Sequence, residues 1–145
     1  MIIVLWVPFA NASPIDDAAE YSVRVKSTVR YAFAGEGTGT SDGAGFLIDK
    51  TRGWILTNAH VSGYGTGDIE VSFKDHGYHN AKPVYIDKEL DIAVIEVLAK
   101  NIPDESSEAK LDCGDRPLNG VAVAAFGHPH GLTYSASRGI ISKVR

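Results

Sequence analysis

The sequence has almost no cysteine and no clustered positive charge, and each absence excludes a class of protein. The single cysteine, Cys113, excludes an internal disulfide and a zinc site built from several thiolates. The 14 lysines and arginines are scattered, and the formal net charge is −4. Nucleic-acid binding requires clustered lysine and arginine to neutralise phosphates, so we expect no nucleic-acid partner.

Long hydrophobic runs are also lacking. No stretch approaches the roughly 20 apolar residues that cross a bilayer, so no stable membrane span is expected. The 44% apolar and 22% charged residues are instead typical of a globular chain. The 145 residues suffice for one ordinary domain or two small halves, and the 15 glycines predict many turns and few long helices.

The amino-terminal residues are typical of an export signal. Residues 2–7 are apolar and lead into Ala10-Asn11-Ala12, a small-residue pattern that predicts cleavage after Ala12. No lysine or arginine precedes the apolar run, so either the amino terminus supplies the positive charge or the start of the signal is missing. The alternative is an apolar end that is disordered or packed. We expect residues 1–12 to be a signal peptide and the protein to be secreted or periplasmic.

Short strand-like segments separated by turn residues follow the signal. Valines alternate with basic residues over 23–29, which predicts a half-buried strand. The apolar segments 45–48 and 54–56 flank a short polar turn and predict a hairpin. Further strands are expected at 69–73, 84–86 and 92–97. Because no convincing helical stretch interrupts them, these segments predict an antiparallel, all-β barrel or sandwich.

The connections are polar. Residues 35–43 contain no apolar side chain and predict an exposed loop, and residues 99–119 predict a linker. New strands are expected at 121–126 and 139–144, beyond that linker. The last of them stops at the end of the sequence, which leaves a sheet edge without its next partner. We therefore expect the chain to be the opening portion of a longer protein.

Four of the five histidines form two close pairs that are candidates for a metal site. The pairs are His76-x-x-His79 and His128-Pro-His130. Neither has a neighbouring set of carboxylates, whereas zinc needs three or four converging ligands. Residues 75–80 are better explained as a polar hairpin turn. We therefore expect no metal.

The fifth histidine, His60, is a candidate general base. It follows the apolar run 54–56, and a histidine just after a buried strand is partly desolvated but reachable. Asp91 is the best candidate to orient its ring, because an unpaired carboxylate beside an apolar strand would be costly. A buried aspartate that accepts the Nδ1–H fixes the tautomer. Asp87 and Glu89 lie in a more polar turn. The alternative is a satisfied core histidine and a turn-capping aspartate.

Several motifs, in this order, resemble the HtrA/DegP-type branch of the trypsin-like serine proteases. They are residues 43–48 (GAGFLI), 53–61 (GWILTNAHV), 91–95 (DIAVI), and 127–132 (GHPHGL) followed by 137–142 (SRGIIS). Any one of them is weak alone, but their order and spacing make the resemblance specific. It extends over residues 20–145.

The resemblance implies a chymotrypsin/trypsin-like double β-barrel, with the first barrel complete and the second truncated. It implies that His60 is the general base, that Asp91 is the orienting acid, that no cofactor is needed, and that unfolded or misfolded polypeptides are the substrates. The expected division is a signal peptide, an N-terminal segment, a first barrel and the start of a second, at residues 1–12, 13–34, 35–112 and 113–145.

The nucleophilic serine is missing from this pattern. In the family it lies in a Gly-Asn-Ser-Gly-Gly-type turn after the aspartate, and no such turn occurs here. The serines after Asp91 lie in the acidic linker or in strand-like segments without such glycines: Ser106, Ser107, Ser135, Ser137 and Ser142. Because the members of a triad act as a unit, we expect this chain alone to be inactive.

Three functions and one assembly remain open from sequence. The chain is either a protease portion, a catalytically dead relative whose barrel binds misfolded protein, or a secreted β-barrel whose histidines bind metal. Members of the family often form homotrimers through an aromatic N-terminal segment. Tyr21, Tyr31 and Phe33 can supply such contacts, or they can belong to the strand core.

Overall fold

The structure is a computed structural model that describes residues 14–31, 37–64, 67–114, 116–128 and 134–143. Helix α1 (Pro14–Tyr21) is followed by six strands: β1 (Ser22–Val29), β2 (Gly39–Asp49), β3 (Trp54–Thr57), β4 (Asp68–Phe73), β5 (Tyr78–Asp87) and β6 (Ile92–Val97). Helix α2 (Ala59–Ser62) follows β3, and the short 3₁₀ helix η1 (Ala99–Asn101) follows β6. Strands β7 (Ala122–Gly127) and β8 (Ser135–Ile140) complete the fold.

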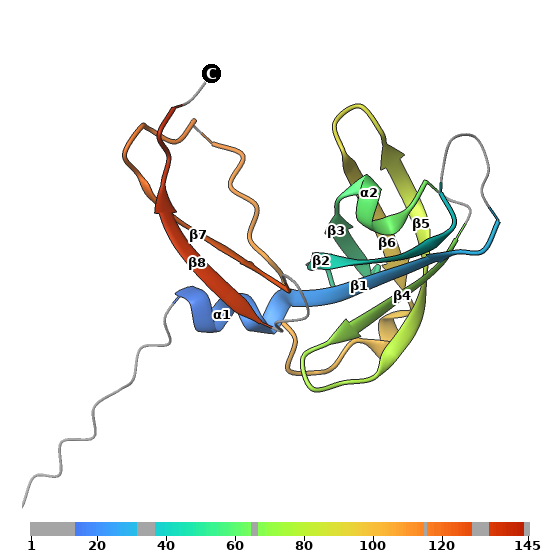
Figure 1. The fold of residues 1–145 in the computed structure, drawn as a ribbon. Helices are drawn as coiled ribbons and strands as arrows, with labels where there is room; N and C mark the ends of the chain where they lie inside the picture. Colours follow the sequence, from blue (N-terminus) through green and yellow to red (C-terminus); the bar gives the residue numbers. More distant parts are fainter. Residues whose placement is uncertain (1–13, 32–36, 65–66, 115, 129–133, 144–145) are drawn as a thin grey trace, which may run out of the picture.

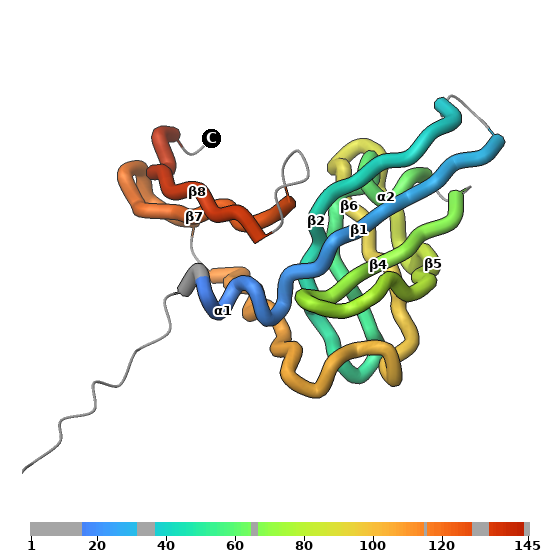
Figure 2. The backbone as a smooth tube through the Cα atoms, turned by 60° about the horizontal axis from the view of Figure 1, so that its bottom comes forward, coloured from blue at the N-terminus to red at the C-terminus, as the bar shows by residue number. Residues whose placement is uncertain are grey.

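The six strands form a closed antiparallel barrel in the order β1-β2-β3-β6-β5-β4, with β4 pairing back onto β1 (Figure 1). Strands β7 and β8 form a separate antiparallel hairpin beside the barrel, next to α1 (Figure 2). This arrangement confirms the predicted all-β fold with a closed first barrel and a smaller second sheet. No helix of the described residues is long and apolar enough to cross a membrane, and the predicted signal peptide, residues 1–12, lies outside them.

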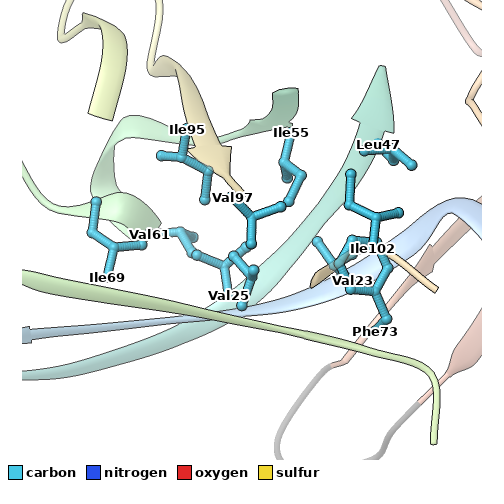
Figure 3. Packing of buried hydrophobic residues seen from close by; sticks show 11 residues of the cluster. Val23, Val25, Leu47, Ile55, Val61, Ile69, Phe73, Ile95, Val97 and Ile102 are labelled. Atoms are coloured by element: carbon cyan, nitrogen blue, oxygen red, sulfur yellow. The ribbon is translucent and has the colours of Figure 1, made fainter. Parts of the chain in front are cut away.

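Alternation of side chains along the strands creates the core. In β6, Ala93, Ile95 and Val97 are buried, while the residues between them are partly exposed. Successive side chains of a strand point to opposite faces of the sheet, so every second side chain points into the barrel. Figure 3 shows the resulting cluster, which includes Val23, Val25, Leu47, Ile55, Val61, Ile69, Phe73, Ile95, Val97 and Ile102.

Three predicted element boundaries need correction. Residues 39–43 are not an exposed loop but the first part of β2, where Ser41 pairs with Ser27 and Gly43 with Val25. Backbone pairing with β1 requires no apolar side chain, so the polar composition was misleading. Strand β5 likewise begins at Tyr78, which shortens the predicted turn over 75–80. Strand β8 occupies Ser135–Ile140 rather than 139–144, because it pairs with β7 over that length.

The amino-terminal part also differs from the expectation. Residues 14–21 form the helix α1, within the segment 13–34 for which no helix was expected. Asp16 and Asp17 lie in its first turn, where carboxylates interact favourably with the helix dipole. Strand β1 lies within the predicted N-terminal segment 13–34, yet it pairs with both β2 and β4 and is part of the barrel.

The linker between the two sheets is fastened to the barrel at one turn. Lys50, after β2, donates from Nζ to the carbonyl oxygens of Asp104 at 2.8 Å and Ser106 at 2.9 Å. The backbone N–H of Ala109 donates to the carbonyl oxygen of Leu47 at 2.8 Å. These bonds hold residues 104–109 against the end of β2.

Gly53 provides a test of how tightly the β2–β3 turn is packed. Its φ of +73° lies in the left-handed region, and a Cβ there would collide with the carbonyl oxygen of Val97. We expect Gly53→Ala to lower the free energy of unfolding by about 2 kcal/mol or more, because strain and collision add. Gly77→Ala is the matched control, since a Cβ at Gly77 meets nothing within 4 Å. Equal urea midpoints for the two variants would contradict this account.

Candidate active site

The site begins where β3 ends and α2 starts. The Thr57 side chain donates to the carbonyl oxygen of Ala44 at 2.8 Å and fixes the end of β3 against β2. In the four-residue helix that follows, Ala59, Val61 and Ser62 are buried. His60 is the remaining member of the helix and is exposed. Packing of its neighbours therefore holds the histidine at the barrel surface, in a helix that the sequence had not indicated.

Asp91 reaches the same place from the neighbouring strand. Strands β3 and β6 are paired with Thr57 opposite Ala93, so the residues just after β3 face those just before β6. The His60 Nδ1 lies 2.7 Å from the Asp91 Oδ2, and the backbone N–H of His60 donates to Oδ1 at 2.9 Å. The structure thus brings the two residues singled out by the sequence into direct contact.

Asn58 completes the contact. Its side-chain amide donates to the carbonyl oxygen of Asp91 at 3.1 Å and to Oδ2 at 3.2 Å. Asp91 has a φ of +54°, an uncommon conformation for a residue with a Cβ. One carboxylate therefore accepts hydrogen bonds from the backbone of His60, its ring and the amide of Asn58.

These bonds determine the charge of Asp91. The backbone N–H of His60 makes the largest contribution to lowering the pKa of the Asp91 carboxyl, and the ring of His60 and the amide of Asn58 lower it further. The side chains are more open than the sequence suggested: 63% of His60 and 43% of Asp91 is exposed. The expectation of a buried aspartate is wrong: the carboxylate keeps contact with solvent and is further stabilised by its hydrogen bonds.

The turn before Asp91 is held by a second aspartate. Oδ1 of Asp87 accepts the backbone N–H groups of Glu89 and Leu90, each at 2.9 Å, and Oδ2 accepts the hydroxyl of Tyr85 at 3.1 Å. Sequence reasoning set Asp87 aside as a polar turn residue and gave no role to Asn58. The available signal for both was their place next to the end of a strand, where polar side chains often bond to the backbone.

A cleft of about 760 Å³ lies between this site and the second sheet. His60 and Val61 line it on the barrel side, and Phe126, His128, Ser135 and Ser137 are among the lining residues of β7, β8 and the loop after β7. Neither of these serines is hydrogen-bonded to His60 in the described part of the chain. Both lie in β8 rather than in a tight turn.

The remaining histidines do not form a common site. His76 contacts Glu105 at 2.9 Å, while His79 lies in β5 opposite Val71. His128 accepts the backbone N–H of Tyr134 at Nδ1, and burial lowers the pKa of its ring. Its neighbour in the sequence motif, His130, lies outside the described residues. Over the ranges that the structure describes, no three His, Cys, Asp or Glu side chains are grouped to hold a metal ion.

The hydrogen bonds to Asp91 predict how stability changes with pH. Because its pKa is lower in the folded than in the unfolded chain, the ionised carboxylate stabilises the fold above the unfolded value, and this contribution is lost as the pH falls through the folded value. We expect the free energy of unfolding, measured with urea, to fall more between about pH 5 and pH 2 in the parent chain than in Asp91→Asn. Asp104→Asn, at an exposed linker position, should keep the parental dependence. If the free energy of unfolding depends on pH identically in the parent and in Asp91→Asn, the lowered pKa of Asp91 is contradicted.

The sequence matches the family described as trypsin-like peptidase domain over residues 43–145. It is 39% identical over 106 residues to a probable periplasmic serine endoprotease, DegP-like, of Halomonas elongata, which covers 70% of this chain and 20% of the relative. The putative serine protease HhoB of Synechocystis sp. is 36% identical over 100 residues, which is 69% of this chain and 23% of the relative. The chain thus spans about a fifth of the length of these curated relatives.

Solved structures show the same fold. The serine endoprotease from Yersinia pestis aligns with a TM-score of 0.70 and 28% identity over 95% of this chain and 46% of the solved chain. An HtrA-type protease solved with a tripeptide aligns with a TM-score of 0.72 and 28% identity, over 94% and 40% of the respective chains. Together with the barrel and the motifs at its edge, these similarities show that the chain belongs to the trypsin-like peptidase family, in its HtrA/DegP-type branch.

Proposed function

We propose that this chain supplies the general base and the orienting acid of an HtrA/DegP-type serine endopeptidase. His60 is the base and Asp91 the acid, and the substrates are unfolded or misfolded polypeptides. The observation that carries the proposal is the 2.7 Å contact between the His60 Nδ1 and the Asp91 Oδ2 at the wall of the cleft. The relatives named as serine endoproteases support the same reaction class.

The geometry assigns a protonation state to the ring. An ionised carboxylate can only accept hydrogen bonds, so Nδ1 of His60 carries the proton that faces Asp91. Nε2 is then the unprotonated nitrogen, available to remove the proton from a serine hydroxyl as it attacks a peptide carbonyl. The negative Asp91 stabilises the imidazolium that forms, and Nε2 later returns the proton to the leaving amine.

The nucleophile is the part of this reaction that the 145 residues do not contain. No Gly-x-Ser-Gly turn occurs in them, and Ser135 and Ser137 lie in β8 without a hydrogen bond to His60 within the described residues. The turn that carries the nucleophile also supplies oxyanion-hole donors, which contribute much of the rate on their own. The alternative is a catalytically dead relative whose first barrel binds exposed segments of misfolded protein.

A location and an assembly are further parts of the proposal. Several curated relatives are named periplasmic, and we propose the same location here, with residues 1–12 as the signal peptide. A homotrimer joined through the amino-terminal aromatic residues is part of the same proposal. Tyr31 is 84% exposed and available for such a contact, whereas Tyr21 packs against the barrel core.

The purified 145-residue chain is expected not to hydrolyse unfolded casein. Without a positioned serine there is no acyl intermediate, and loss of one triad member costs on the order of 10⁴–10⁶ in rate. The measurement is release of acid-soluble peptide with and without a serine-directed inhibitor. Hydrolysis that the inhibitor blocks would show that one of the serines in this chain acts as the nucleophile.

A chimera tests the proposed roles directly. In it, the matched residues of this chain replace the corresponding segment of the Halomonas elongata relative, whose remaining sequence is kept. We expect this chimera to hydrolyse casein. His60→Ala should reduce the rate by about 10⁴–10⁶-fold because the base is removed, and Asp91→Asn by about 10⁴-fold because the ring of His60 then takes the wrong tautomer.

His76→Ala is the matched control for this chimera. His76 also pairs with a carboxylate, that of Glu105 at 2.9 Å, but it lies in the turn between β4 and β5 and does not line the cleft. Its substitution should leave kcat/KM unchanged. A chimera that binds casein but hydrolyses none would favour the binding module, and full activity of His60→Ala would refute the assigned base.

A further inference from the structure

Asn58 occupies a position at which its side chain would ordinarily serve its own helix. It is the N-cap residue of α2, with extended backbone angles of φ −83° and ψ 147°. An asparagine there usually accepts a hydrogen bond from an N–H of the first helical turn. In this structure the Asn58 side chain makes no capping bond. The side chain forms its hydrogen bonds with another residue instead.

That partner is Asp91, which Asn58 contacts at two atoms. The same amide nitrogen, Nδ2, lies 3.1 Å from the backbone oxygen and 3.2 Å from the carboxylate Oδ2 of Asp91. Both oxygens only accept hydrogen bonds, so the NH₂ group rather than the Oδ1 of Asn58 must face them. One side chain thereby joins the backbone of Asp91 to its own carboxylate.

The two bonds restrain the two motions that would separate Asp91 from His60. The bond to the backbone oxygen supports the left-handed conformation at φ +54°, which a residue with a Cβ adopts only when its surroundings hold it. The bond to Oδ2 restrains rotation of the carboxylate. Without it, Oδ2 would keep the ring of His60 as its remaining partner, while Oδ1 would stay on the backbone N–H of His60.

We propose that Asn58 is a positioning residue that fixes the carboxylate of Asp91 for its contact with the ring of His60. The inference rests on the proposed function, in which Asp91 orients the base. It is consistent with a helix start whose asparagine gives the helix no side-chain cap. The role differs from that of His60 and Asp91, because Asn58 acts only through the aspartate.

The test compares three substitutions in the 145-residue chain by NMR. Asn58→Ser keeps a residue able to cap a helix and removes the amide, Asn58→Ala removes both abilities, and Asn58→Leu keeps a similar size without a donor or an added charge. We expect all three to shift the pH titration of the Asp91 carboxyl carbon upwards and to broaden or remove the Nδ1–H proton signal of His60. Amide correlation spectra confirm that each variant is folded, and Asn58→Leu provides the result if a smaller side chain prevents folding.

Two outcomes would overturn the proposal. If Asn58→Ser keeps the parental titration and ring signal while Asn58→Ala loses them, the role is helix capping. If neither signal changes in any folded variant, Asn58 does not position Asp91. Asp91→Asn separates this failure from failure of the proposed function: if the His60 ring signal survives in Asp91→Asn, the pairing itself is refuted.

The chimera supplies a second readout. Displacement of an orienting group by about 1 Å can cost on the order of a hundredfold in rate, so Asn58→Ser should lower kcat by tenfold to a hundredfold and leave KM unchanged. An unchanged kcat would contradict the positioning role even if the protein is less stable. A chimera without any activity would bear on the proposed function, while the NMR comparison would still decide the role of Asn58.

Discussion

The pairing of β3 with β6 is the constraint on which the rest of the site depends. Thr57 lies opposite Ala93, so the chain leaving β3 and the chain entering β6 meet at one edge of the barrel. His60 and Asp91 are separated by 31 positions in the sequence but by only 2.7 Å between their side chains. A shift of the register by one residue would reverse the faces of every side chain in β3 and would separate the pair.

Closure of the barrel protects that register. Each of the six strands has two neighbours, and the alternating apolar side chains of β1, β3, β4 and β6 fill the interior. An edge strand could slide or pair elsewhere, whereas a strand bonded on both sides and buried on one face has a single favourable alignment. The polar groups of the site lie at the rim of this rigid scaffold, so the core sets their positions without burying them.

Polar side chains then refine what the barrel places approximately. Asp87 stabilises the turn that ends β5, and Asn58 spans the gap between the two strand ends. Both form hydrogen bonds with backbone groups at or just before Asp91. The second sheet contributes the far wall of the cleft, and the bonds of Lys50 fasten the first part of the linker to the barrel. A site open to water can therefore still hold its groups at fixed distances.

The sequence by itself determined the strands whose apolar residues alternate, such as 92–97, and the two residues of the pair, because their motifs carry the chemistry in their residue types. It could not determine that polar residues 39–43 are a strand, since their conformation comes from pairing with β1 rather than from their own side chains. It also misjudged the environment of Asp91, which is partly exposed and accepts hydrogen bonds from three donors on another segment. The contact of Asn58 with Asp91 could not be predicted from sequence either. The two residues lie 33 positions apart, and only the tertiary register of two strands brings an amide and a carboxylate within hydrogen-bonding distance.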